Sequence, residues 1–215
     1  MYAQQLEVLW PHGGVILANH TRDDSMAALA RRVLAEAPPR FALVGLSMGG
    51  YISFEILRQA PERVAKVALL DTMARADSPE VSAARRTQME QAAGGYFTEV
   101  IRALIPRLVH QSRQADAALV ELIVGMGQEV GVAGYLRQQT ANIGRADSRA
   151  TLGNIRCPTL VLVGDSDLLT PPERAAEIAA AIPGAELVVV PACGHLSTLE
   201  RPAAVNDALR AWLSR

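Results

Sequence analysis

The sequence predicts an α/β fold, in which a mostly parallel sheet is flanked by helices and interrupted by an all-α insertion. Short runs of consecutive apolar residues alternate with amphipathic helical patterns up to about residue 71 and again from about residue 152. Such runs are typical of parallel strands that are buried on both faces. Between these regions the strand-like runs disappear, and Ala, Arg, Gln and Leu dominate at helical spacing. We therefore expect an α/β core formed by residues 1–71 and 152–215, with a helical cap insertion at residues 72–151.

The length and charge of the chain restrict its class. Its 215 residues suit one domain with a small insertion, and 50% of them are hydrophobic, which is enough to form a core. Lys and Arg number 21 against 22 Asp and Glu, which gives a net charge of -1 without a run of like charges. We therefore expect neither nucleic acid nor a membrane as a partner.

Cysteine usage and the first residues indicate a cytoplasmic protein. Cys157 and Cys193 form neither a zinc-ligand spacing nor a redox pair. The first residues do not resemble a signal peptide, and the longest apolar runs are too short to span a bilayer.

The first part of the core shows three strand-like runs. Val15–Ala18 is a short apolar run that predicts a buried strand, and residues 23–25 offer side chains that cap the helix after it. Pro38-Pro39 ends that helix, Phe41–Val44 predicts a second strand, and Val64–Leu70 predicts a third.

The segment between the two parts of the core predicts three or four helices. Pro79 is placed to open one helix and Gly94-Gly95 to end it, while Pro106 predicts a kink or a split in the next helix. Gly125, Gly127 and Gly131 follow another apolar stripe and predict its end.

Alternation resumes in the last part of the chain. Pro158–Val163 predicts a strand, and Thr170–Glu173 predicts a capping box with proline at the first helical position. Leu187–Val190 predicts the last strand, and Pro202–Trp212 the final helix.

The pattern G-x-S-x-G occurs at Gly45–Gly49, between a predicted strand and a predicted helix. This context is what a nucleophile elbow requires, although an ordinary strand-to-helix turn remains the alternative when the motif is taken alone. In an elbow, Ser47 would stand above the sheet edge. The backbone N–H of Met48 would be free to bind an oxyanion.

A serine hydroxyl needs a base, and the base needs an orienting carboxylate. Asp167 follows the predicted strand Pro158–Val163, and His195 follows the predicted strand Leu187–Val190. Ser47, Asp167 and His195 would therefore lie just beyond the carboxyl ends of parallel strands, where open α/β sheets place their sites.

Three blocks of the chain resemble the α/β-hydrolase superfamily, and in particular its capped esterase, enol-lactonase and haloperoxidase-like branch. These blocks are GLSMGGY, PTLVLVGDSDLLTPPE and CGHLSTLERP. The resemblance implies Ser47 as nucleophile, His195 as general base and then acid, and Asp167 as the partner of His195. It also implies hydrolysis of a small carboxylic ester or lactone through an acyl-serine, without a metal or an organic cofactor.

Other candidate residues have simpler explanations. Asp165 is two residues from the expected acid and is expected to be structural or solvated, while Asp71 ends a strand at a position where some hydrolases take their acid. Cys193 is expected to pack in its loop rather than act as a nucleophile. The remaining histidines are expected on the surface or in loops: His12, His20 and His110. Three cap arginines either meet a substrate carboxylate or form a solvated face: Arg102, Arg107 and Arg137.

The chain departs from the family pattern near its start. The family implies an apolar strand that ends in His-Gly and supplies a second oxyanion N–H, whereas Val15–Ala18 resembles the next strand and Tyr2–Leu9 the helix between the two. His12-Gly13-Gly14 resembles the oxyanion motif but precedes a predicted strand instead of following one. We therefore do not interpret it as an oxyanion loop.

Two accounts of this departure stay open. Either the chain is a shortened form with an open sheet edge, which leaves room for a homodimer, or Val15–Ala18 fills the vacant position and brings Asn19 or His20 near the oxyanion. Loss of one oxyanion donor costs about 3–4 kcal/mol of transition-state stabilisation.

Alternative functions follow from the same residues. An impaired hydrolase fold would serve as a binding protein, and the same triad serves C–C bond hydrolysis or perhydrolysis in other enzymes. The aliphatic cap, in a chain with only 4% aromatic residues, favours a small apolar acyl or ring group.

Overall fold

The computed structural model describes residues Met1 to Arg215 and contains a four-stranded sheet in the order β1-β2-β3-β4. The strands are β1 (Phe41–Leu46), β2 (Val64–Leu70), β3 (Thr159–Gly164) and β4 (Glu186–Val190). Every neighbouring pair is parallel. The predicted strands at these four places are confirmed, since continuous Val and Leu runs bury both faces of a strand.

Helices cover both faces of this sheet. Alternate residues of β2 point to opposite sides: Val67 and Leu69 pack with helices α2 (Met26–Glu36), α3 (Met48–Gln59) and α8 (Pro172–Ala181). Ala68 and Leu70 pack with α10 (Pro202–Leu213), on the other face. The strand period of two thus divides the apolar residues between two cores, one on each side of the sheet.

The prediction of a strand at Val15–Ala18 is wrong. Residues 14–20 have no regular secondary structure, and β1 is paired only with β2. An apolar run becomes a strand only where a neighbour accepts its hydrogen bonds, and here Ile16 and Leu17 instead remain 58% and 65% exposed. The outer edge of β1 is therefore open.

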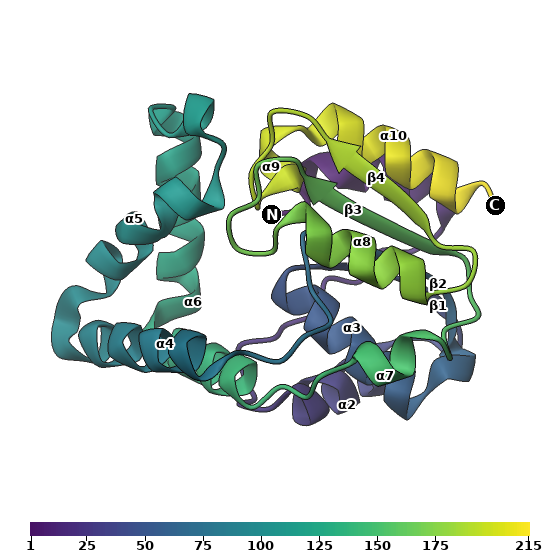
Figure 1. Ribbon diagram of the computed structural model, residues 1–215, viewed down its shortest axis with the longest axis horizontal. Coiled ribbons are helices and arrows are strands. Elements are labelled where there is room, and N and C mark those ends of the chain that lie inside the picture. Colours follow the sequence, from purple (N-terminus) through teal and green to yellow (C-terminus); the bar gives the residue numbers. More distant parts are fainter.

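The chain between β2 and β3 contains only helices. Helices α4 (Pro79–Gln91), α5 (Phe97–Leu108) and α6 (Ala117–Ile143) lie together to one side of the sheet (Figure 1), with a π-helical turn at Ala92–Tyr96 between α4 and α5. The short helix α7 (Arg149–Leu152) spans the expected cap boundary and contacts α8.

Two predictions within this helical segment differ from the structure. The split expected at Pro106 is absent, since α5 continues to Leu108. Gly125 and Gly127 lie inside α6, and only Gly131, at φ 69°, interrupts its helical backbone. A side chain at Gly127 would collide with Ile101, so this glycine permits close packing of α5 on α6 instead of ending a helix.

Helix α6 is longer than the sequence pattern predicted, because it continues through the glycines that were expected to end it. By length and composition alone, its 27 residues could cross a membrane, contrary to the expectation that no apolar run is long enough. It contacts α4 and α5, and its buried side chains include Ile123 and Val124. We therefore describe it as part of the helical cap.

The first residues form short helical turns at Ala3–Gln5, at α1 (Leu6–Leu9) and at Trp10–His12. They pack on the C-terminal part of the chain, where the side-chain amide of Asn206 donates to Gln4 O at 2.9 Å. The hydroxyl of Tyr2 accepts a hydrogen bond from Leu46 N at 2.9 Å. The turn at Ala3–Gln5 thus begins beside the last residue of β1.

Candidate active site

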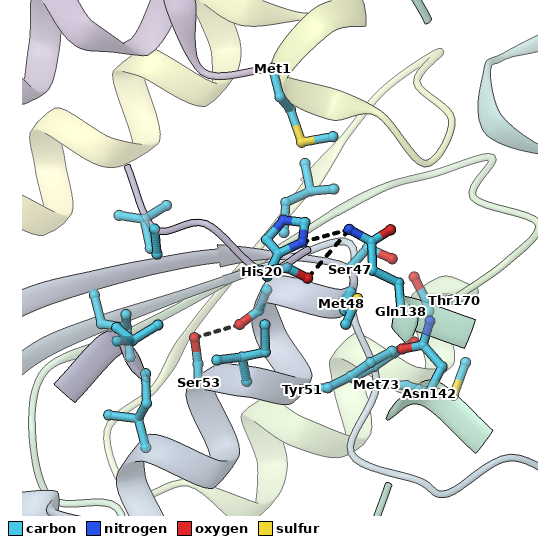
Figure 2. A pocket seen from close by; sticks show the side chains of 18 of the residues that line it. Met1, His20, Ser47, Met48, Tyr51, Ser53, Met73, Gln138, Asn142 and Thr170 are labelled. Carbon is cyan, nitrogen blue, oxygen red and sulfur yellow. Dashed lines mark hydrogen bonds between the residues drawn. The ribbon is translucent and has the colours of Figure 1, made fainter. Parts of the chain in front are cut away.

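A cavity of about 1630 Å³ opens at the carboxyl ends of the strands and continues along the open edge of β1. Its lining includes Ser47 and His195 from the core, Gln138 from α6 and residues 14–18 from the segment without regular structure. Figure 2 shows Ser47, Met48 and Thr170 together in this cavity.

Ser47 lies in a strained turn between β1 and α3. Its φ of 51° and ψ of -112° lie in a region that non-glycine residues rarely adopt. Ser47 N donates to Leu70 O at 2.9 Å, and Thr72 Oγ1 donates to Ser47 O at 2.9 Å, which hold the turn. A side chain at Gly45 would collide with the carbonyl of Gly49, so this glycine is needed for the strand and helix to approach. The predicted elbow geometry is present.

The structure brings Ser47, His195 and Asp167 into one hydrogen-bonded chain. Ser47 Oγ lies 2.8 Å from His195 Nε2, and His195 Nδ1 lies 2.8 Å from Asp167 Oδ2. His195 and Asp167 are 3% and 2% exposed, so water does not compete for these bonds. The arrangement lets His195 accept the proton of Ser47 while Asp167 orients the ring.

The pKa values of Asp167 and His195 shift in opposite directions, and both shifts favour the ion pair that forms when His195 is protonated. Burial acts to raise the pKa of Asp167, but the hydrogen bond and charge of His195 outweigh it and hold that pKa below its ordinary value. Burial acts to lower the pKa of His195, but the hydrogen bond and charge of Asp167 outweigh it and raise that pKa. The pair therefore stabilises the imidazolium that a general base becomes.

Thr170 belongs to this site, although its sequence pattern predicted a helix cap. Its hydroxyl donates to Asp167 Oδ2 at 2.7 Å, and its N–H donates to Asp167 Oδ1 at 2.9 Å. The N-cap of α8 is Pro171 instead, and it makes no side-chain cap bond. The capping-box prediction is wrong because the threonine hydroxyl bonds to Asp167. In the sequence, the signal for this role was the position of Thr170, three residues after Asp167.

The other two aspartates hold backbone near the site. Asp71 is fully buried and accepts hydrogen bonds from Gly164 N, Ser197 N and Ser197 Oγ, and makes none with His195. Burial raises the pKa of Asp71 to about 7. Asp165 accepts from Ala192 N at 3.0 Å and Cys193 N at 3.2 Å, so it fixes the turn before His195. Asp167 alone among the three faces the imidazole.

The loop that carries His195 is tied to the cap. Leu108 O, at the end of α5, accepts from His195 N at 3.0 Å and from Leu196 N at 3.2 Å. The buried Glu200 accepts from His110 N at 2.7 Å and from Gly194 N at 2.8 Å. Cys193 is buried in this loop, and burial raises the pKa of its thiol, which disfavours the thiolate that a nucleophile requires.

His20 was expected on the surface or in a loop; it lies in a loop that lines the cavity. Gln138 Nε2 is 2.8 Å from His20 Nδ1 and 3.5 Å from His20 O (Figure 2). The adjoining Thr21 O accepts from Arg137 Nε at 2.7 Å. These bonds attach the segment to α6, and burial lowers the pKa of His20. The sequence named His20 only as a residue near the oxyanion in one of the two accounts, and it did not predict the bond to Gln138, which is more than a hundred positions away.

The remaining candidates lie outside the hydrogen-bonded chain. His12 is exposed, and His110 Nδ1 bonds to Ser112 within its own turn. Arg102 forms an exposed ion pair with Glu121, and Arg107 lines the cavity from an exposed position. No group of three or more His, Cys, Asp or Glu residues is arranged to hold a metal ion.

One oxyanion donor is present in the backbone. Met48 is the first residue of α3, where a helix leaves its N–H without an intrahelical acceptor. No strand lies beyond β1 to supply a second backbone donor. The Val15–Ala18 segment does not fill that place, although it lines the same cavity.

Comparisons with known proteins found a matching family and similar structures. Residues 12–208 match the family described as "Alpha/beta hydrolase family". The structure is similar to a thermophilic esterase from Thermogutta terrifontis, with 31% identity, a TM-score of 0.88 and coverage of 99% of this chain and 84% of that chain. It is also similar to the enol-lactonase from Burkholderia xenovorans LB400, with 25% identity, a TM-score of 0.86 and coverage of 100% and 86%. A pimeloyl-[acyl-carrier protein] methyl ester esterase of Nitrosomonas europaea is 28% identical over 186 residues, which are 83% of this chain and 73% of that protein.

Proposed function

The chain belongs to the α/β-hydrolase family, and from this premise we propose that it hydrolyses a small carboxylic ester or lactone through an acyl-Ser47 intermediate. The observation that carries the proposal is the continuous chain from Ser47 Oγ through His195 to Asp167, with 2.8 Å at each step. Esterase and enol-lactonase relatives support this substrate class.

The first half-reaction transfers the acyl group to the protein. Ser47 Oγ attacks the carbonyl carbon while His195 Nε2 takes the hydroxyl proton, and Met48 N–H donates to the oxyanion that forms. His195 then gives the proton to the departing alkoxide, so that the alcohol leaves and acyl-Ser47 remains. In a lactone the same bond breaks, but the alcohol stays attached to the acyl group.

The second half-reaction restores Ser47. His195 Nε2 takes a proton from water as the water attacks the acyl carbon, and returns a proton to Ser47 Oγ as the ester bond breaks. The carboxylic acid leaves, and no external cofactor enters either step. Asp167 stays ionised and stabilises the imidazolium in both.

A fluorophosphonate probe tests this proposal directly. The probe should label the native protein, and Ser47→Ala should abolish both labelling and the hydrolysis of p-nitrophenyl acetate and butyrate. Ser214→Ala is the matched control, because Ser214 is exposed at the end of α10, and it should keep both. Absence of labelling and of ester or lactone turnover in the native protein would reject the proposal.

A further inference from the structure

The proposed reaction leaves one requirement unmet by the backbone. The carbonyl oxygen becomes a full negative charge in the tetrahedral intermediate, and each positioned donor contributes strongly in such a site. Met48 N–H is one donor, and β1 has no outer neighbour that would offer another N–H. A side chain on the open side of β1 is therefore a candidate for the second donor.

Tyr2 lies at that side and is hydrogen-bonded to the residue that precedes Ser47. Successive residues of a strand direct their backbone groups to opposite sides. Ser47 N bonds inward to Leu70 of β2, and Leu46 N bonds outward to Tyr2 Oη at 2.9 Å. Because one peptide unit spans about 3.8 Å, Tyr2 Oη is within about 8 Å of Ser47 Cα.

The hydroxyl of Tyr2 keeps its own proton free for a ligand. The oxygen accepts from Leu46 N, but the hydroxyl donates to no protein atom. Tyr2 lines the same cavity as Ser47, Met48 and His195. Burial raises the pKa of the Tyr2 hydroxyl, and the nearby Asp71 charge adds to the rise, so the group stays protonated across the working pH range. A buried phenol ordinarily finds an acceptor, and here the cavity is where an acceptor would bind.

We propose that Tyr2 is a catalytic residue whose hydroxyl donates the second hydrogen bond to the oxyanion on Ser47. The bond from Leu46 N holds the phenol oxygen, and Met48 N–H and Tyr2 O–H then act on the same developing charge. No proton is transferred in this step. The inference rests on the proposed ester hydrolysis and adds to it the residue that completes the oxyanion site.

His20 is the competing side-chain donor in the cavity. Its Nδ1 faces Gln138 Nε2, which can only donate, so a neutral His20 carries its proton on Nε2. Its hydrogen bonds attach it to α6, whereas Tyr2 is bonded to the residue that precedes Ser47. This difference in attachment favours Tyr2.

Steady-state kinetics on a p-nitrophenyl ester test the assignment. Tyr2→Phe should lower kcat by about 10²–10³-fold with KM changed less than about threefold, because the lost bond forms only in the transition state. Tyr2→p-methoxyphenylalanine keeps the oxygen that accepts from Leu46 N but has no proton to donate, and it should lose as much. Tyr96→Phe, in an exposed position of the cap, is the matched control and should retain full activity.

Three outcomes would overturn the inference. The first is a Tyr2→Phe variant with kcat within threefold of the native value. The second is activity retained by the methoxy variant, which would leave Tyr2 with a positioning role through Leu46. The third is a loss of kcat in His20→Ala without a loss in Tyr2→Phe. Thermal melting separates a folding defect from a lost donor. Labelling of the native protein by the fluorophosphonate, with unchanged kcat in Tyr2→Phe, would reject this inference and leave the ester-hydrolase proposal intact. Absence of native labelling would reject both.

Discussion

Leu108 O, at the end of cap helix α5, accepts a hydrogen bond from the backbone N–H of His195 at 3.0 Å. The cap therefore does more than cover the cavity, because it fixes the backbone of the proposed general base. Glu200 strengthens the same junction by accepting from His110 N of the cap and Gly194 N of the core.

Weakening this junction should affect stability and catalysis together. Glu200→Gln replaces a carboxylate oxygen by an amide that donates, so one of the two buried N–H groups loses its acceptor, at a cost of about 1–3 kcal/mol. We expect a lower free energy of unfolding in urea and a lower kcat/KM. Glu121→Gln, in an exposed cap ion pair, is the control and should change stability by less than about 1 kcal/mol. Equal stability of the two variants would contradict the role of Glu200.

The pH profile of the proposed activity should depend on Asp167. His195 accepts a proton only when neutral, so kcat/KM should rise as pH increases through the pKa of His195. Asp167 raises this pKa, and Asp167→Asn should therefore move the acidic limb to lower pH while it lowers kcat by about 10²–10⁴-fold. The measurement is kcat/KM from pH 4 to pH 9. An acidic limb at the same pH in both proteins would argue against this coupling.

Thr170 should act through Asp167 without contacting the substrate. Thr170→Val removes the hydroxyl that donates to Asp167 Oδ2, whereas Thr170→Ser retains one. We expect kcat to fall by about tenfold in the valine variant, as for the loss of one hydrogen bond to a charged group, and to recover largely in the serine variant. Similar kinetics for the two variants would show that the hydroxyl is not required.

Asp71 should make stability depend on pH in the direction opposite to an ordinary carboxylate. Its pKa rises from 3.8 to about 7 through burial, so the folded protein binds a proton that the unfolded chain has already released. Stability from this group is therefore greatest below about pH 4 and is lost as pH rises toward 7. Relative to Asp71→Asn, which does not titrate, the native free energy of unfolding should fall by up to about 4 kcal/mol across that interval, since one pKa unit corresponds to about 1.4 kcal/mol. Urea unfolding of both proteins from pH 4 to pH 8 tests this, and parallel curves would refute it.

Predictions about local structure succeeded where the structure of a segment depended on the residues of that segment and not on a distant partner. The runs that became β2 and β4 contain enough Val and Leu to be buried on both faces, and Pro202 opens α10 as expected. The same approach failed at Val15–Ala18, whose apolar pattern has no neighbouring strand, and at Gly127, whose purpose is contact with Ile101. Homodimer formation through the open edge of β1, and a cytoplasmic location, stay predictions.

The sequence by itself determined the strand-turn-helix setting of Ser47 and the order in which Asp167 and His195 follow it. The family resemblance already implied Asp167 as the partner of His195, and the tertiary structure decided that Asp71 and Asp165 bond to backbone N–H groups instead. It also decided that Thr170 bonds to Asp167 and that Tyr2 bonds to Leu46. The physical reason is the distance along the sequence over which each kind of interaction acts. Periodicity and turn chemistry act over a few residues, whereas the contact between Tyr2 and Leu46 depends on how helices and strands distant in sequence pack together.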